Sequence, residues 1–171
     1  MIEPPHQPGD LPPEVQSCLR RAEGFVDLKM PARARVELER IPAALHDHPA
    51  CRVARLNLLM LEKNWAEAFP IARRLREQFP QHAEHWISDA YVTRRARNIA
   101  EAEPILIEAA GLFPRQAVIV YNLACYACQL GHLDKARALL KLLVQHHPEW
   151  RAAAVQDDDL APLHDELEED A

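Results

Sequence analysis

Apolar residues between Val120 and Pro148 recur every three or four positions, in two sets separated by a single glycine. The first set consists of Val120, Leu123, Ala124 and Ala127. The second set consists of Ala136, Leu139, Leu140 and Leu143. This spacing predicts two amphipathic helices. We expect Gly131 at the turn between them, because a glycine readily adopts the left-handed conformation that ends a helix. Pro148 should end the second helix.

The same arrangement recurs along the chain with a period of 34 residues. Three prolines have that spacing: Pro80, Pro114 and Pro148. Four alanines follow it as well: Ala34, Ala68, Ala102 and Ala136. A fixed period of this length indicates copies of one helix pair that bury their apolar faces by stacking. Because no stretch alternates apolar and polar residues for long, we predict an all-α fold without a sheet.

These features resemble the tetratricopeptide repeat over roughly residues 14–156, with small residues at Ala90 and Ala124 in the first helices of the last two copies. The resemblance implies a right-handed α-solenoid of about four helix pairs, closed by a short capping helix that ends at residue 156. We assign the repeats to residues 14–48, 49–82, 83–116 and 117–150. The first copy carries about three extra residues before Pro49, so its exit turn should be irregular. Pro70 and Pro104 are expected in the first turn of their helices, where a proline sacrifices no hydrogen bond.

The two ends of the chain differ from the repeats. Residues 1–13 contain five prolines, and we expect a disordered lead-in there. Residues 157–171 form an acidic tail with eight acidic residues and no Lys or Arg. We expect a disordered, solubilising tail, with docking on a basic cluster and self-inhibition as the alternatives. The segment from Pro148 onward also resembles a closing module of bacterial repeat proteins, which implies a helix over 149–155 and places Leu160 and Leu163 against the end of the stack.

Charge and composition argue against several classes of function. The net charge of −6 comes from the tail, so the repeats are nearly neutral and we expect no nucleic-acid partner. The longest apolar stretch, residues 117–128, is too short to span a bilayer, and we expect no membrane association. The chain begins without a secretory signal pattern. Four cysteines in apolar helical contexts indicate reduced thiols and a cytoplasmic location.

Candidate chemistry is weak. Cys125 and Cys128 form a C-x-x-C motif, but they lie within one helix, and we interpret them as small apolar fillers. Six of the nine histidines group in three pairs: His46 with His48, His82 with His85, and His146 with His147. Because the pairs fall in different copies, we interpret them as solvated residues and expect no metal. No catalytic residue and no cofactor is predicted.

Two basic clusters are the remaining charged features, and each has two readings. They consist of Arg73, Arg74 and Arg76, and of Arg94, Arg95 and Arg97. We interpret them as solvated faces balanced by neighbouring glutamates. The alternative is that they receive an acidic partner or the tail of this chain.

The resemblance also implies a concave groove lined by the first helix of each pair. The family's groove positions fall on Val53, Asn57, Met60, Ile87, Tyr91, Arg94, Arg95, Tyr121, Cys125, Cys128 and Gln129. Tyrosine and arginine are common anchors at protein interfaces. We therefore expect a protein or peptide ligand, with an acidic residue as one candidate to meet Arg94 or Arg95. The alternative is that Val53, Ile87 and Tyr121 only pack between neighbouring repeats.

The function predicted from these features is a non-enzymatic adaptor that binds a peptide segment in the groove. A carboxylate clamp of the kind that binds chaperone C-termini is disfavoured, because Val53, Val118 and Asn122 stand where basic residues are expected and only Asn57 fits. The first alternative is a secretion-type repeat chaperone, although the proline-rich start does not supply the N-terminal helix of that class. A metal-dependent enzyme that uses the histidine pairs is the less favoured alternative.

Overall fold

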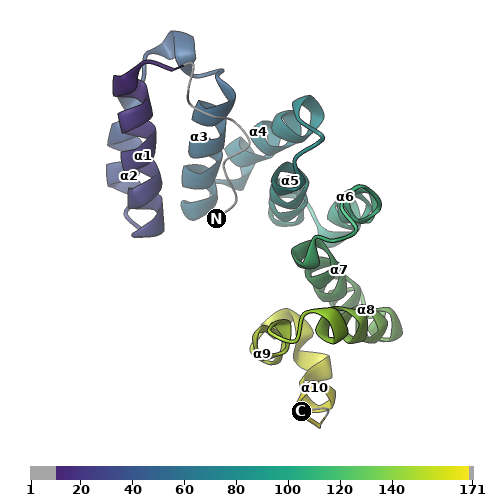
Figure 1. Cartoon of the computed structure of the whole chain (residues 1–171). Helices are drawn as coiled ribbons and strands as arrows, with labels where there is room; N and C mark the ends of the chain where they lie inside the picture. The colour runs from purple at the N-terminus through teal and green to yellow at the C-terminus, as the bar shows by residue number, and fades with distance from the viewer. Residues whose placement is uncertain (1–10, 170–171) are drawn as a thin grey trace. The chain divides into compact units, whose positions relative to one another are not determined.

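The structure, a computed structural model, describes residues 11–169 and divides the chain into two compact units. Unit 1 comprises Met1–His85, unit 2 comprises Trp86–Ala171, and each is described by itself. The described residues form helices and no strand, as the sequence predicted. Consecutive helices pack in pairs, α1 with α2, α3 with α4, and α7 with α8 (Figure 1).

The helices follow one another with short connections. In unit 1 they are α1 (Pro13–Asp27), α2 (Pro31–Glu39), the 3-10 helix η2 (Ala43–Leu45), α3 (Pro49–Leu61) and α4 (Trp65–Gln78). Helix α5 (Ala83–Ala96) contributes its residues from Trp86 onward to unit 2. Unit 2 continues with α6 (Ile99–Leu112), α7 (Ala117–Gln129), α8 (Leu133–His146), α9 (Trp150–Val155), the 3-10 helix η3 (Asp158–Leu163) and α10 (His164–Glu169).

The 34-residue period is a period of the structure as well as of the sequence. The four alanines that carry it are each the fourth residue of the second helix in a pair, and each is fully buried: Ala34, Ala68, Ala102 and Ala136. Helices α4, α6 and α8 each end two residues before one of the periodic prolines, Pro80, Pro114 and Pro148. A methyl group at the buried position lets the two helices of a pair approach closely, which explains why alanine recurs there.

The left-handed turn inside a pair also repeats, in three of the four pairs. Gly131 has φ 78°, so the left-handed turn expected at this residue is confirmed. Lys29 and Lys63 occupy the same conformation with φ 56° and 57°, at positions 34 residues apart. Sequence reasoning missed both, because a lysine gives no sign that its backbone is left-handed.

Two local expectations come out differently. The irregular exit of the first copy is confirmed by η2, which lies between α2 and α3. Pro70 and Pro104, however, are not in the first turn: each is the sixth residue of its helix, α4 or α6. A proline there has no N–H for the carbonyl four residues earlier, so each helix lacks one backbone hydrogen bond.

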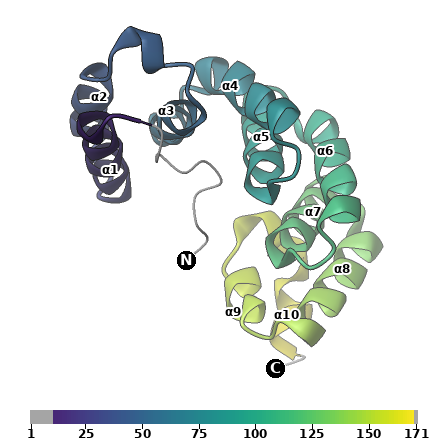
Figure 2. The ribbon, with the colours of Figure 1, turned by 45° about the horizontal axis from the view of Figure 1, so that its top comes forward.

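The C-terminal segment is ordered as far as Glu169, contrary to the expectation of a disordered tail. Helix α9 matches the predicted short helix, beginning one residue later at Trp150. Leu160 and Leu163 are 0% and 1% exposed and join the core of unit 2, as predicted. Figure 2 shows α9 and α10 lying together beside α8. The segment therefore covers the apolar end of the last helix pair, which a terminal repeat requires.

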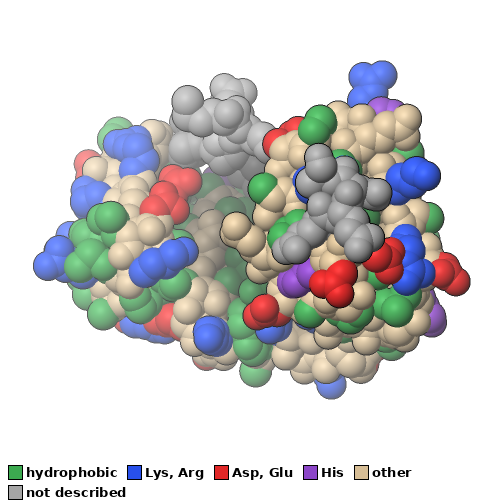
Figure 3. All heavy atoms as spheres, turned by 90° about the horizontal axis from the view of Figure 1, so that it is seen from below, with side chains coloured by type: hydrophobic (Ala, Val, Ile, Leu, Met, Phe, Trp, Pro, Cys, Tyr) green, Lys and Arg blue, Asp and Glu red, His purple; other side chains and the backbone are tan. Residues whose placement is uncertain are grey.

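The surface is mixed in character. Figure 3 shows one face of the molecule, on which Lys and Arg side chains are interspersed with Asp and Glu. Within residues 11–169, no helix has both the length and the apolar character that crossing a membrane requires.

Candidate functional site

Three consecutive aspartates, Asp157–Asp159, form what we call the acidic turn, at the start of η3. The turn is stabilised locally, because the backbone N–H of Asp159 donates to Asp157 Oδ1 at 3.0 Å. This is the usual way in which an aspartate caps a turn. The two outer carboxylates point toward α5 and α7, where three side chains bind them and a fourth binds the backbone carbonyl of Asp159. These contacts constitute the candidate site.

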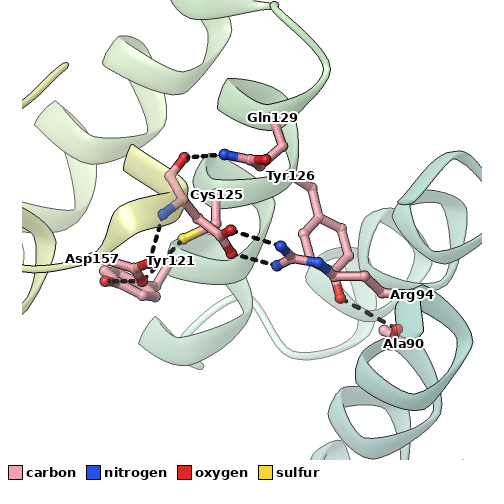
Figure 4. Close-up of polar contacts among 8 residues, drawn as sticks. Ala90, Arg94, Tyr121, Cys125, Tyr126, Gln129 and Asp157 are labelled. Carbon is pink, nitrogen blue, oxygen red and sulfur yellow. Dashed lines mark hydrogen bonds and ion pairs between the residues drawn. The ribbon is translucent and has the colours of Figure 1, made fainter. Parts of the chain in front are cut away.

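Arg94 on α5 binds Asp159 with both arms of its guanidinium. Its Nη2 donates to Asp159 Oδ1 at 2.7 Å, and its Nη1 donates to Asp159 Oδ2 (Figure 4). The two side chains are only 15% and 26% exposed. The hydrogen bond with Asp159 raises the pKa of Arg94 above its ordinary value. A fork-to-carboxylate pair in this half-buried setting is stronger than an ordinary surface ion pair.

Arg94 is also held from its other side. Its guanidinium lies 5.3 Å from the centre of the Tyr126 ring, within the range of a cation–π contact. The Tyr126 hydroxyl donates to the backbone carbonyl of Ala90 at 3.2 Å, which anchors α7 to α5. Burial raises the pKa of Tyr126 to about 12. The arginine is therefore held in place by α7 as well as by the acidic turn.

Asp157 is bound by α7. The Tyr121 hydroxyl donates to Asp157 Oδ2 at 2.7 Å, and the Cys125 thiol donates to the same oxygen at 3.7 Å (Figure 4). The Tyr121 ring packs against Trp150 with ring centres 4.8 Å apart. Burial and the hydrogen bond with Asp157 raise the pKa of Tyr121. Burial, followed by the charge of Asp157, raises the pKa of the Cys125 thiol, so both groups remain protonated donors.

Gln129 completes the site from the last turn of α7. Its side-chain Nε2 donates to the backbone carbonyl of Asp159 at 3.0 Å (Figure 4). Arg94, Tyr121, Cys125 and Gln129 thus all act as hydrogen-bond donors toward the turn. We call these four residues the donor set. Donors that converge in this way accommodate carboxylates and carbonyls.

The rim of the site is open. A hollow of about 540 Å³ lies beside the acidic turn and is lined by Arg95, Tyr121, Ala153, Gln156 and the turn itself. The guanidinium of Arg95 lies 5.3 Å from the ring centre of Tyr91, which is 39% exposed. Asp158 is exposed and has no hydrogen bond or ion pair with any described residue. Space therefore remains beside the docked turn.

The structure separates the predicted groove residues into groups. In unit 2, Arg94, Tyr121, Cys125 and Gln129 come together at the acidic turn. Ile87 is half-buried and packs against the core, as the alternative interpretation held, and Cys128 is 4% exposed within that core. In unit 1, Val53, Asn57 and Met60 lie on α3 and are half-exposed. A continuous groove through both sets remains a prediction.

The acidic turn itself was missed as part of a site, although docking of the tail on a basic cluster was one alternative. The signal in the sequence was the run of three aspartates, which stands out because the rest of the chain is nearly neutral in charge. Arg94 of the second basic cluster receives the turn, whereas Arg73 and Arg74 of the first cluster pair with Glu77 and Asp47 in unit 1.

Metal binding and cysteine chemistry find little support in the geometry. Among the described residues, one group of metal-ligand type converges within 4.8 Å, namely Cys125, Asp157 and Asp159, and it includes none of the paired histidines. The Arg94 fork and the Tyr121 hydroxyl already occupy its carboxylate oxygens. Burial raises the pKa of Cys128 as well. Cys128 thus behaves as the buried apolar filler that we predicted, whereas the Cys125 thiol also donates a hydrogen bond to Asp157.

Comparison with known proteins bears on the same segment. Residues 94–156 match the family model described as tetratricopeptide repeat. The match begins at Arg94 and ends directly before the acidic turn, so it contains the whole donor set. A search of curated proteins found no match. The family resemblance predicted from the 34-residue period is confirmed.

Proposed function

We propose that this chain, which is a tetratricopeptide-repeat protein, is a non-enzymatic adaptor that binds a peptide segment of another protein on the α5–α7 face of unit 2. Tetratricopeptide repeats generally mediate protein–protein interaction, and their fold is typically a scaffold without catalysis. The observation that carries the proposal is that this face already holds a peptide segment, the acidic turn, through side chains of two helices.

The open rim supports the same proposal. Tyr91 and Arg95 form a stacked pair beside the docked turn, and both side chains are exposed. Tyrosine and arginine contribute large contact areas and directional hydrogen bonds, which is why they dominate binding energy at interfaces. We infer that a partner segment enters through this rim.

The compartment and source are part of the proposal. The four cysteines are free and buried, which suits a reducing compartment. The closing segment resembles that of bacterial repeat proteins. We therefore assign the adaptor to a bacterial cytoplasm.

Site-specific photocrosslinking in the native cell tests the proposed function. A photoreactive phenylalanine analogue replaces Tyr91, and a matched probe replaces Leu142, which is 52% exposed on α8 away from the hollow. We expect a discrete crosslinked protein from position 91 that is absent from position 142. The additional change Arg95→Ala should reduce that product. Identical products from both positions would contradict the assignment of this face.

A further inference from the structure

The acidic turn is bound as a separate ligand would be bound. Its partners in the donor set lie 30 to 65 residues earlier in the chain, on two helices, and they contact it through side chains. Its own three residues are half-exposed or exposed, whereas the neighbouring Leu160 and Leu163 are buried. Leu160 and Leu163 therefore fix the position of the turn, and the donor set fixes the orientation of its side chains.

The donor set defines what this place accepts. Arg94 takes one carboxylate through two parallel hydrogen bonds, and Tyr121 takes a second carboxylate two residues earlier. Gln129 takes a backbone carbonyl of the same segment. The side chain between the two aspartates is exposed and has no hydrogen bond or ion pair with any described residue, so its identity is not read. The pattern that is recognised is thus Asp-x-Asp.

We propose that the α5–α7 site recognises a partner segment that carries an Asp-x-Asp pattern, and that the acidic turn is an internal occupant which such a segment displaces. This proposal rests on the proposed function and names the class of its partner. The contacts from the donor set go to two carboxylates and one backbone carbonyl, which a separate acidic peptide also carries. The hollow beside the turn, next to Arg95, is where the incoming chain continues.

Competition within the molecule has a measurable consequence. A tethered segment is present at an effective concentration on the order of millimolar, so a free peptide of equal chemistry competes poorly with it. Removal of the two contacting carboxylates weakens the internal occupant and leaves the donor set intact. Binding of the free peptide should then become tighter.

A fluorescent peptide with the sequence of residues 155–161 of this chain serves as the probe, and its anisotropy is measured with the full chain. We expect at least tenfold tighter binding to the chain with D157N and D159N than to the wild type. The matched control is D158N, which removes the aspartate without contacts and should leave affinity unchanged. Adding R94A to the doubly substituted chain should abolish the gain. A probe with asparagine at its first and third aspartates should not bind.

The proposal is overturned if the doubly substituted chain binds the probe no more tightly than the D158N chain, or if the gain survives R94A. If circular dichroism shows that the doubly substituted chain has lost helix, the D159N chain replaces it, with the same tenfold gain required. A crosslink from position 91 without any gain in probe binding would refute the Asp-x-Asp proposal and keep the proposed function. A gain in probe binding without a crosslink from position 91 would refute entry of a partner protein at the rim and keep recognition of the Asp-x-Asp pattern.

Discussion

The ion pair between Arg94 and Asp159 should contribute measurable coupling to the stability of unit 2. Hydrogen bonds to charged groups contribute about 1.5–3 kcal/mol when they are shielded from water, whereas exposed ion pairs contribute about 0.2–1 kcal/mol. With side chains 15% and 26% exposed, this pair lies nearer the shielded limit. We therefore expect a coupling free energy of about 2 kcal/mol. Arg94→Ala alone should cost more than Asp159→Ala, because it also removes the cation–π contact with Tyr126.

A double-mutant cycle isolates the pair from that additional contact. Urea unfolding is measured for the wild type, Arg94→Ala, Asp159→Ala and the double variant. The reference pair is Arg137 with Glu166, which also forms a two-armed contact but is 43% and 50% exposed. We expect clearly smaller coupling for the reference pair. Equal coupling in the two cycles would refute the reasoning, because shielding would then make no difference.

Three further predictions concern other parts of the fold. Arg52 is 8% exposed, and its Nε and Nη1 have no hydrogen-bond partner. Because a buried charge without hydrogen bonds is costly, Arg52→Met should raise the free energy of unfolding in urea by about 1–2 kcal/mol. The control Arg55→Met should not raise it. Lys63→Gly should raise the free energy of unfolding by about 0.5–1 kcal/mol, because glycine adopts φ 57° without steric cost; an unchanged midpoint would contradict this. The hydrogen bond from Arg137 lowers the pKa of Glu166, so this ion pair stabilises α10 fully above pH 4.5 and loses that effect as the pH falls through the lowered pKa. Amide hydrogen exchange in α10 should therefore become faster, relative to the intrinsic rate, as the pH falls through the lowered pKa. Glu166→Gln should remove this pH dependence.

The helix pairs were predictable because they follow from local spacing. Apolar residues at helical intervals, one buried alanine per pair and a proline after each pair leave few other arrangements for the chain. The error at Pro70 has a local cause as well. Asn64 accepts from the backbone N–H of Glu67, and its amide donates to the Glu67 side chain, which marks the first turn of α4. Had this capping pattern been recognised, Pro70 would have been placed in the second turn.

The site was only partly predictable, because its two halves are far apart in the sequence. Groove positions on α5 and α7 follow from the repeat register, which is why Arg94, Tyr121 and Gln129 were proposed. Nothing local shows that Asp159, 65 residues after Arg94, lies against it. That pairing depends on how Leu160 and Leu163 dock on the last helices, and it is therefore a tertiary property. A run of acids was read as a solvated tail for the same reason.

Amide hydrogen exchange of residues 157–163 tests the central claim, that the α5–α7 face holds the acidic turn through its donor set. In the wild type we expect these amides to exchange much more slowly than unprotected amides. In Arg94→Ala the loss of about 2 kcal/mol should accelerate exchange about 30-fold. Exchange at the unprotected rate in the wild type, or no acceleration in Arg94→Ala, would contradict the claim.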